Sequence, residues 1–266
     1  MPIPAFALIV TAAGSSLRFS SAFDEGESVK KEFLQLDGHT VLYRAAEPFF
    51  ELPSLGAVVI TYRKESLDET VVALEDLADI NTIPMFFVEG GETRQESVRL
   101  ALEKLKSTGM VFPYVAVQDG ARPYVTPRLI INILATAVSG SGAVPALPMT
   151  DSVRRINALG QITECPSRRG LVRVQTPQIF EFEKLYDAHE RFRELPATDD
   201  SELYVAAGYE CTVCEGSEDN IKITYESDIP DARTQIAKYI ETRKKGRSSR
   251  EADEMFRRFV HSGEQT

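Results

Sequence analysis

Small and cationic residues after an apolar segment near the start of the chain could bind phosphate. Phe6–Thr11 is an apolar run of strand length, and Ala12–Gly14 follow it directly. Small residues let the backbone approach a ligand closely, and successive N–H groups in such a turn form an anion cradle. Arg18 and Lys31 follow, and arginine presents a planar fork matched to phosphate oxygens. The segment predicts a nucleotide phosphate site at the carboxyl end of a strand.

Two better-known phosphate loops do not match this segment. A dinucleotide fingerprint needs Gly-x-Gly-x-x-Gly, and only Gly14 is present here. A P-loop needs Gly-Lys followed by Ser or Thr, and the chain lacks that motif. On this segment alone, a strand and a turn with an exposed arginine remains an open alternative.

Another polar cluster follows the apolar run 84–88 and opens a helix. Gly90 and Gly91 allow close backbone approach, Glu92 follows them, and Ser97 offers a hydroxyl to a base or a ribose. The alternative is a capped helix start, in which Thr93 caps the helix and Glu96 completes a capping box. Both interpretations can hold together.

Charged residues follow or interrupt two further apolar runs. Asp119 comes after the run 114–118 and suits a metal or a ribose hydroxyl, whereas Arg122 suits phosphate. A buried structural salt bridge between them is the alternative. Lys222 lies inside the apolar pattern 220–224, and lysine is rarely buried without a partner. A phosphate-facing role is favoured over a snorkelling side chain.

Apolar and amphipathic segments alternate along the chain, which predicts an open, mainly parallel α/β sheet with helices on both faces. We expect strands at Phe6–Thr11, Ala57–Tyr62, Pro84–Val88, Tyr114–Gln118 and Ala143–Leu147. We expect helices at Val41–Phe50, Leu67–Leu77, Thr93–Lys106 and Pro127–Val138. Thr126 before Pro127 is typical of an N-cap followed by proline at the first helical position.

Asp151–Arg173 interrupts the alternation. It is polar and basic, and its turn at 157–160 predicts a projecting β-hairpin arm. The segments expected after it are helices Glu181–Glu194 and Asp200–Ala207, strands Tyr209–Glu215 and Asn220–Thr224, and a helix over about 228–244. We expect one nucleotidyltransferase domain over residues 1–245 and a charged tail over 246–266.

Composition narrows the class of protein. The chain has 266 residues, 43% of them hydrophobic, and a net charge of −10, which argues against nucleic acid as a partner. Three cysteines are too few for a disulfide framework, and the Cys211/Cys214 pair fits strand packing better than metal binding. No apolar run is long enough to span a membrane, and no Lys or Arg precedes the apolar N-terminus as in a signal peptide. We expect a cytoplasmic protein.

The cationic residues together favour nucleotidyl transfer. Arg18, Lys31, Arg122 and Lys222 would gather positive charge around a glycine-containing cradle in an acidic protein. In that reaction a substrate phosphate attacks the α-phosphorus of a nucleoside triphosphate, and pyrophosphate leaves. The chemistry needs positioning and charge neutralisation by cations and Mg²⁺. It needs no general base, because a phosphate monoester is already ionised near neutral pH.

Seven motifs in one order resemble those of the 2-C-methyl-D-erythritol 4-phosphate cytidylyltransferase family of the non-mevalonate isoprenoid pathway. The resemblance covers about residues 5–240. The motifs are Ala12-Ala-Gly14 with Arg18 and Lys31, Gly90-Gly91 with Arg94 and Ser97, Asp119-Gly-Ala-Arg-Pro123, Asp151-Ser-Val-Arg-Arg155, Gln175-Thr-Pro-Gln-Ile-Phe180, Thr198-Asp-Asp200 and Asn220-Ile-Lys222-Ile-Thr224.

The resemblance implies roles for particular residues. Catalytic roles fall on Arg18, Lys31 and Lys222; nucleotide-binding roles on Ala12, Ala13, Gly14, Gly91, Glu92, Ser97 and Asp119; and substrate-binding roles on Asp119, Arg122, Ser152, Arg168 and Thr176. Ser152 and Arg168 match arm positions that reach the neighbouring subunit's substrate phosphate. The resemblance further implies CTP and a polyol phosphate as partners, a Rossmann-like fold and a homodimer formed through the arm. Mg²⁺ is expected mainly on the CTP phosphates, with Asp119 nearby.

The chain also departs from the family pattern. Ser16 replaces a glycine, Lys30 a proline and Ser152 a threonine, while Gln118 and Gly120 replace histidine and alanine. A ribitol-5-phosphate cytidylyltransferase shares the fold and the CTP loop and is the alternative enzyme. A regulatory nucleotide-binding protein would lack Arg18, Lys31 or Lys222, all of which are present. A sugar nucleotidyltransferase using another nucleotide fits the fold alone.

Overall fold

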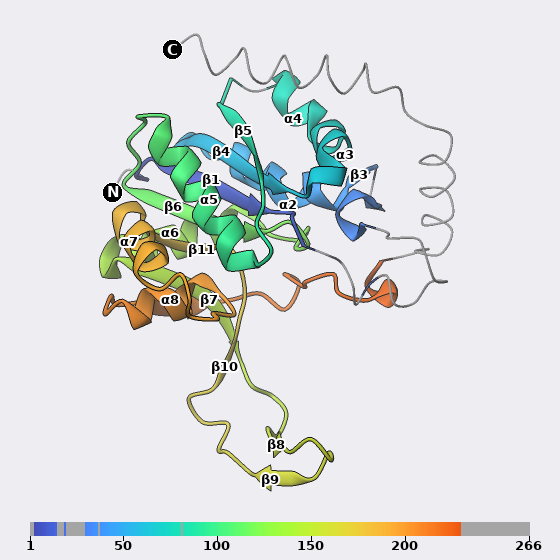
Figure 1. Ribbon diagram of the computed structural model, residues 1–266, viewed down its shortest axis with the longest axis vertical. Helices are drawn as coiled ribbons and strands as arrows, with labels where there is room; N and C mark the ends of the chain where they lie inside the picture. Colours follow the sequence, from blue (N-terminus) through green and yellow to red (C-terminus); the bar gives the residue numbers. More distant parts are fainter. Residues whose placement is uncertain (1–2, 15–18, 20–29, 37, 81, 230–266) are drawn as a thin grey trace.

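An eight-stranded mixed sheet forms the centre of the protein (Figure 1). The computed structural model describes residues 3–14, 19, 30–36, 38–80 and 82–229. The strands of this sheet are β1 (Phe6–Thr11), β4 (Leu55–Tyr62), β5 (Met85–Glu89), β6 (Tyr114–Asp119), β7 (Gly142–Pro148), β10 (Val172–Val174), β11 (Gln178–Glu181) and β12 (Thr212–Glu215). Their order is β10-β7-β11-β6-β1-β4-β5, and β12 pairs with β7.

The expected mainly parallel arrangement is confirmed. β1 lies parallel to β4 and β6, β5 is parallel to β4, and β12 is parallel to β7. β11 was not predicted as a strand, and it runs antiparallel between β6 and β7. Three of its four residues belong to the Gln175–Phe180 motif.

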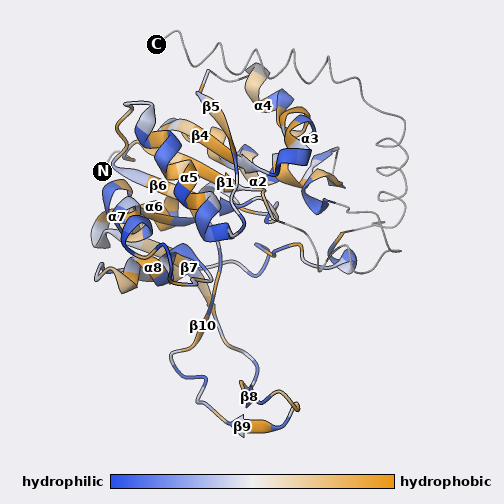
Figure 2. Ribbon diagram, in the orientation of Figure 1, coloured by the Kyte–Doolittle hydropathy of each residue, from blue (hydrophilic) through white to orange (hydrophobic). Residues whose placement is uncertain are grey.

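Helices cover both faces of the sheet. They are α2 (Val41–Phe50), α3 (Leu67–Ala73), α4 (Glu75–Ile80), α5 (Arg94–Ser107), α6 (Pro127–Gly140), α7 (Phe182–Arg191) and α8 (Asp200–Ala206). In β1, Leu8 and Val10 pack in the core with α2 and α6, whereas Ala7 and Ile9 pack in the core with α5, α7 and α8. The alternation of side chains along a strand thus gives β1 two apolar faces, and Figure 2 shows hydrophobic strands at the centre.

Capping residues set several helix starts where the sequence places them. Thr126 caps α6 by accepting a hydrogen bond from the Leu129 N–H, and Thr93 caps α5 in the same way. The expected single helix over 67–77 is wrong, because the chain breaks at Leu74. There the Leu74 N–H bonds to Val71 in a tighter turn, which keeps Leu74 and Leu77 buried.

The expected arm is present and projects away from the sheet, at the bottom of Figure 1. Its neck is β10 paired antiparallel with β7, and its tip is a small hairpin of β8 (Arg155–Ile156) and β9 (Ile162–Glu164). Gly160 in the tip turn has φ +76°, a conformation that glycine adopts without steric cost. Hydrophobic colour at the tip in Figure 2 corresponds to exposed Ile156, Leu159 and Ile162.

The expected strand at Asn220–Thr224 is wrong. This segment is irregular and follows the loop after β6, where the Ile223 N–H donates to the Ala121 carbonyl. After it come a short 3₁₀ turn at Glu226–Asp228 and residues 230–266, so most of the expected 228–244 helix and the whole tail lie outside the described residues.

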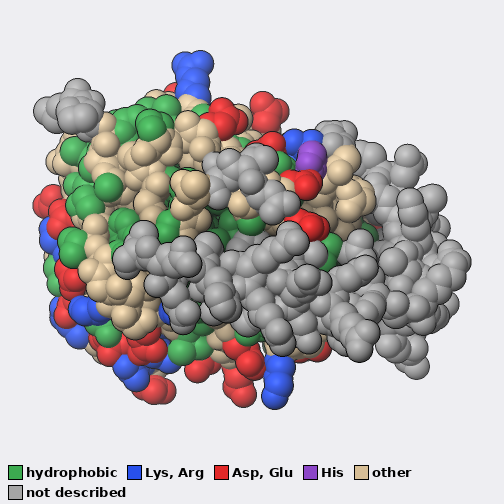
Figure 3. Space-filling model, turned by 90° about the horizontal axis from the view of Figure 1, so that it is seen from above, with side chains coloured by type: hydrophobic (Ala, Val, Ile, Leu, Met, Phe, Trp, Pro, Cys, Tyr) green, Lys and Arg blue, Asp and Glu red, His purple; other side chains and the backbone are tan. Residues whose placement is uncertain are grey.

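Charges of both signs are intermingled around the rim of the face seen in Figure 3, within the described part of the chain. Two further short strands, β2 (Gln35–Leu36) and β3 (His39–Thr40), form a separate pair before α2. Among the described helices, none has the length and apolarity needed to cross a membrane.

Candidate active site

A cleft of about 410 Å³ lies at the carboxyl ends of the central parallel strands. β4 and β5 lie on one side of β1, and β6 lies on the other side. The strand order therefore reverses between β1 and β6, next to the cleft. Such a switch point is where ligands bind in open α/β sheets. The cleft is lined by Thr11, Ala13, Gly14, Phe19, Lys31, Glu32, Arg63, Gly91, Glu92, Thr93, Arg94, Ser97, Asp119, Ala121, Lys222 and Thr224.

Two cations hold the described start of the expected phosphate loop. Arg63 Nε donates to the Ala13 carbonyl at 3.0 Å, and Lys30 Nζ donates to the Gly14 carbonyl at 2.6 Å. Lys30 is only 4% exposed, and desolvation lowers its pKa. Because the N–H of a trans peptide points opposite to its carbonyl, the Gly14 N–H points away from Arg63. The predicted catalytic residue Arg18 lies outside the described residues.

Lys31 lies at the cleft, as expected for a residue acting on the triphosphate. It begins a short 3₁₀ turn at Lys31–Phe33, and its Nζ donates to the Ile223 carbonyl at 2.6 Å. This bond joins two segments far apart in the sequence and brings Lys31 beside the irregular strip that carries Lys222. The two lysines that the sequence singles out therefore line one cleft.

Asp119 is the charged centre of the site. Its Oδ1 lies 3.2 Å from Arg94 Nε, and its Oδ2 lies 2.7 Å from Lys222 Nζ. Arg122 Nε is farther from Oδ2, at 3.8 Å. Burial alone would raise the pKa of Asp119, but Lys222, Arg94 and Arg122 outweigh it and hold that pKa well below its usual range. Asp119 is thus a carboxylate that orients cations.

A hydrogen-bond network of buried amides and a hydroxyl holds the backbone of Asp119 in place. The Thr176 hydroxyl accepts a hydrogen bond from the Asp119 N–H at 3.0 Å and donates to Gln118 Oε1 at 2.9 Å. Asn220 Nδ2 donates to the Thr176 carbonyl at 2.8 Å, and Arg122 Nη1 donates to the Asn220 carbonyl at 2.7 Å. Predicted substrate ligands Thr176 and Arg122 therefore lie next to Asp119 and hold its segment in place.

The Gly90–Ser97 segment closes the other side of the cleft. A Cβ on Gly90 would lie 2.4 Å from Ala13 Cβ and 2.7 Å from Ser97 Oγ, so only glycine fits there. Ser97 is buried, and its hydroxyl donates to the Thr93 carbonyl at 2.9 Å. Glu96 accepts from the Glu92 N–H at 2.8 Å, one residue earlier than the expected capping box.

Ser152 and Arg168 do not reach this cleft. Both are exposed on the arm, and Arg168 Nη1 donates to the Thr150 carbonyl. Figure 1 shows the arm extending away from the sheet, so these two predicted substrate-binding residues are separated from the rest of the site.

Sequence reasoning assigned no site role to two cations of the cleft. Arg63 carries no motif of its own, and its position next to Ala13 depends on the pairing of β1 with β4. Arg94 belongs to the Gly90–Ser97 motif, but its contact with Asp119 at the end of β6 joins two residues that lie far apart in the sequence.

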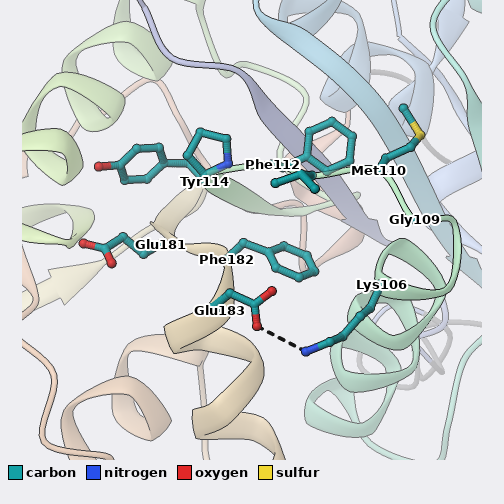
Figure 4. Close-up of a pocket in the computed structure, with 10 residues that line it drawn as sticks. Lys106, Gly109, Met110, Phe112, Tyr114, Glu181, Phe182 and Glu183 are labelled. Carbon is teal, nitrogen blue, oxygen red and sulfur yellow. Dashed lines mark hydrogen bonds and ion pairs between the residues drawn. The ribbon is translucent and has the colours of Figure 1, made fainter.

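A second pocket, of about 480 Å³, lies at the amino end of β6, whereas the cleft lies at its carboxyl end (Figure 4). It is formed around Tyr114 at the start of β6 and Glu181 at the end of β11, where Lys106 Nζ lies 3.1 Å from Glu183. The pocket is mainly apolar and lies away from the carboxyl strand ends, so we assign the active site to the charged cleft.

Comparison with known proteins identifies the family. The sequence profile of the 2-C-methyl-D-erythritol 4-phosphate cytidylyltransferases matches residues 6–238. The chain belongs to this family. A cytidylyltransferase of that name from Cereibacter sphaeroides is 35% identical over 231 residues, which is 87% of this chain and 96% of the relative. A solved family structure from Thermus thermophilus, 28% identical, superposes with a TM-score of 0.62 over 86% of this chain and 96% of that one.

Some relatives carry more than this domain. A bifunctional IspD/IspF enzyme from Paracoccus denitrificans is 39% identical over 231 residues, or 86% of this chain. The chain spans 56% of that relative, about half the length of the bifunctional relatives it matches. The family assignment makes the chain a cytidylyltransferase of isoprenoid biosynthesis, and it favours methylerythritol phosphate over ribitol 5-phosphate as the acceptor. The predicted enzyme class and Rossmann-like fold are thereby confirmed.

Proposed function

We propose that this chain transfers the cytidylyl group of CTP to 2-C-methyl-D-erythritol 4-phosphate. An oxygen of the acceptor phosphate forms a bond to the α-phosphorus of CTP, the bond from that phosphorus to the bridging oxygen breaks, and pyrophosphate leaves. One observation carries the proposal. Lys31, Asp119 and Lys222 come from three distant segments and line one cleft beside the small-residue loop. The family assignment supports the same reaction.

The contacts suggest a division of labour within the cleft. The cradle of Ala12, Ala13 and Gly14 takes the triphosphate, and Gly91, Glu92 and Ser97 border the nucleoside. Lys31, with Arg18, stabilises the charge that develops on the α-phosphorus. Lys222, Asp119, Arg122 and Thr176 hold the acceptor, with Lys222 facing its phosphate. Such positioning lowers the barrier without a general base.

We propose that Mg²⁺ enters the site on the triphosphate, as part of the CTP substrate. Both oxygens of Asp119 already contact cations, Arg94 on Oδ1 and Lys222 on Oδ2, so this carboxylate does not fit a protein-held metal. Within the described ranges, no group of three or more His, Cys, Asp or Glu side chains could hold a metal ion. Mg²⁺ commonly binds through substrate phosphates and keeps several waters.

We further propose a cytoplasmic homodimer that forms through the arm. Ile156 and Ile162 are 60% and 61% exposed, and an isolated two-stranded hairpin is marginally stable in water. Pairing two arms about a two-fold axis would cover these side chains and bring Ser152 and Arg168 toward the partner's cleft. Arg168 can grip a phosphate there with two parallel N–H bonds.

A pyrophosphate-release assay tests the reaction. Four nucleoside triphosphates are crossed with methylerythritol phosphate and ribitol 5-phosphate, with Mg²⁺ and with a chelator. We expect turnover with CTP and methylerythritol phosphate, and its loss when the chelator is present. Faster turnover of ribitol 5-phosphate would reassign the acceptor. No release with any pair in Mg²⁺ would refute the proposed function.

A further inference from the structure

A chain of buried ion pairs leads from Asp119 to α7, away from the cleft. Arg94 donates from Nε to Asp119, and its Nη1 lies 2.7 Å from Asp200 Oδ2. The other oxygen of Asp200, Oδ1, lies 3.0 Å from His189 Nε2. The side chains of Asp200 and His189 are both 1% exposed. Neither residue lines the cleft, so neither can contact a substrate bound there.

The Arg94 guanidinium is shared between two carboxylates. Burial would lower its pKa, but Asp200 and Asp119 outweigh burial and raise it, so the group stays charged. Its Nε and Nη1 have different partners, and this fixes the plane of the fork. Asp200 thus offsets the charge of Arg94, whereas Lys222 and Arg122 lie against Asp119.

Buried ion pairs add little net stability, because desolvation offsets the attraction between the charges. A chain of this kind is better suited to orientation. The backbone supports that interpretation, since the N–H of Asp200 donates to Gln178 Oε1 at 3.2 Å and the start of α8 is thereby anchored to β11. Asp200 is held on a rigid base and can set the position of Arg94.

We propose that Asp200 and His189 are positioning residues for the cytidylyl transfer: they hold Arg94 in the orientation that fixes the Asp119 carboxylate beside Lys222. The inference rests on the proposed function. A small displacement of Asp119 or Lys222 would move the acceptor relative to the α-phosphorus, and misplacement of about 1 Å can lower a rate about 100-fold.

A matched control is available on the next residue of α5. Gln95 Nε2 donates to the Phe192 carbonyl at 2.9 Å, and its Oε1 accepts from the Ala197 N–H at 3.2 Å. Gln95 therefore ties α5 to the same α7–α8 region without contacting Asp119. Loss of this tie affects stability and leaves the orientation of Arg94 in place.

The experiment compares Asp200→Asn, His189→Phe, Arg94→Gln and Gln95→Leu in the full chain. Steady-state rates are measured well below each variant's melting temperature and corrected for the folded fraction. We expect kcat to fall about 10- to 100-fold for Asp200→Asn and less for His189→Phe. The KM for CTP should stay within about threefold, because the loop that binds the triphosphate is untouched. Gln95→Leu should lower the melting temperature and keep the wild-type kcat.

Coupling between the residues separates positioning from general damage. The double variant Asp200→Asn/Arg94→Gln should be no slower than Arg94→Gln alone, because both changes act through one contact. Arg94→Lys, which keeps the charge, should recover part of the loss. Additive losses, or a wild-type kcat in both Asp200→Asn and His189→Phe, would overturn the inference. Inactive wild-type enzyme would instead refute the proposed function.

Discussion

Removal of the Lys31 ammonium gives the sharpest test of how the cleft works. Lys31 is 9% exposed, and Lys31→Met keeps most of its aliphatic stem and deletes the charge. One preorganised donor to a developing charge is worth about 2–4 kcal/mol in the transition state. At 1.36 kcal/mol per decade, this predicts that kcat falls about 30- to 1000-fold. The KM for CTP should change much less, because the interaction strengthens in the transition state.

The same substitution has a structural cost that must be separated from the kinetic one. It removes the 2.6 Å bond from Nζ to the Ile223 carbonyl, and an unsatisfied buried acceptor costs about 1–3 kcal/mol of stability. Thermal unfolding with and without CTP, followed by rates measured well below the melting temperature, separates the two effects. The exposed Lys64, changed to Met, is the matched control and should keep the wild-type kcat.

Lys30 gives the result that would refute this reasoning. Because its Nζ bonds to the Gly14 carbonyl, Lys30→Met should loosen the loop and raise the KM for CTP more than it lowers kcat. If Lys30→Met abolishes kcat while Lys31→Met is nearly normal, the transition-state charge interacts with Lys30, and the roles assigned to the two lysines are reversed.

Four further outcomes are expected. Mixing Arg168→Ala with Lys31→Met should restore activity toward about a quarter of wild type, because a heterodimer contains one intact site; subunit exchange without recovery would show that Arg168 does not act in trans. Truncation after Gly246 should leave kcat/KM within a few-fold of wild type, and loss of the dimer would contradict this. The pKa of Asp119 is lowered in the folded protein, so the ionised carboxylate contributes its full stability above the ordinary carboxyl pKa of about 4 and loses it as pH falls below that value. The difference in free energy of unfolding between wild type and Asp119→Asn, measured with urea, should therefore shrink as pH is lowered. Gly90→Ala should raise the KM for CTP several-fold, since the added Cβ would lie within 3 Å of two neighbouring side-chain atoms, and unchanged CTP kinetics would count against a tight contact there.

The sequence predicts the sheet well where local pattern and tertiary environment agree. β1 and α2 have the expected bounds, and the Thr126 cap with its following proline starts α6 as expected. Prediction fails where packing decides. The helix break at Leu74 has no proline or glycine to signal it. Asn220–Thr224 alternates like a strand but does not pair with a neighbouring strand.

For the site, too, the residue types are predictable from the sequence, but their spatial arrangement is not. Asp119 is predicted from its place after an apolar run, and Lys31 and Lys222 are predicted among the cations that gather around the small-residue loop. Their mutual arrangement does not follow from the sequence, because the 2.7 Å contact between Lys222 and Asp119 joins residues far apart in the chain. Asp200 is harder still to anticipate, since a buried carboxylate near a helix start is usually assigned to capping.

The antiparallel pair of β7 and β10 at the base of the arm means that the arm can be deleted without breaking the sheet. Pro148 at the end of β7 faces Val172 at the start of β10 across an antiparallel pair. Two such strand ends can be joined by a two-residue turn of the Asn-Gly kind, so the chain can bypass residues 149–171 without disturbing the sheet. Val174 then still leads directly into the segment that holds Asp119. The arm is thus an excursion between two paired strands: its removal would keep the strand pairing of the catalytic domain and would delete Ser152 and Arg168, the residues that the proposed dimer places in the partner's cleft.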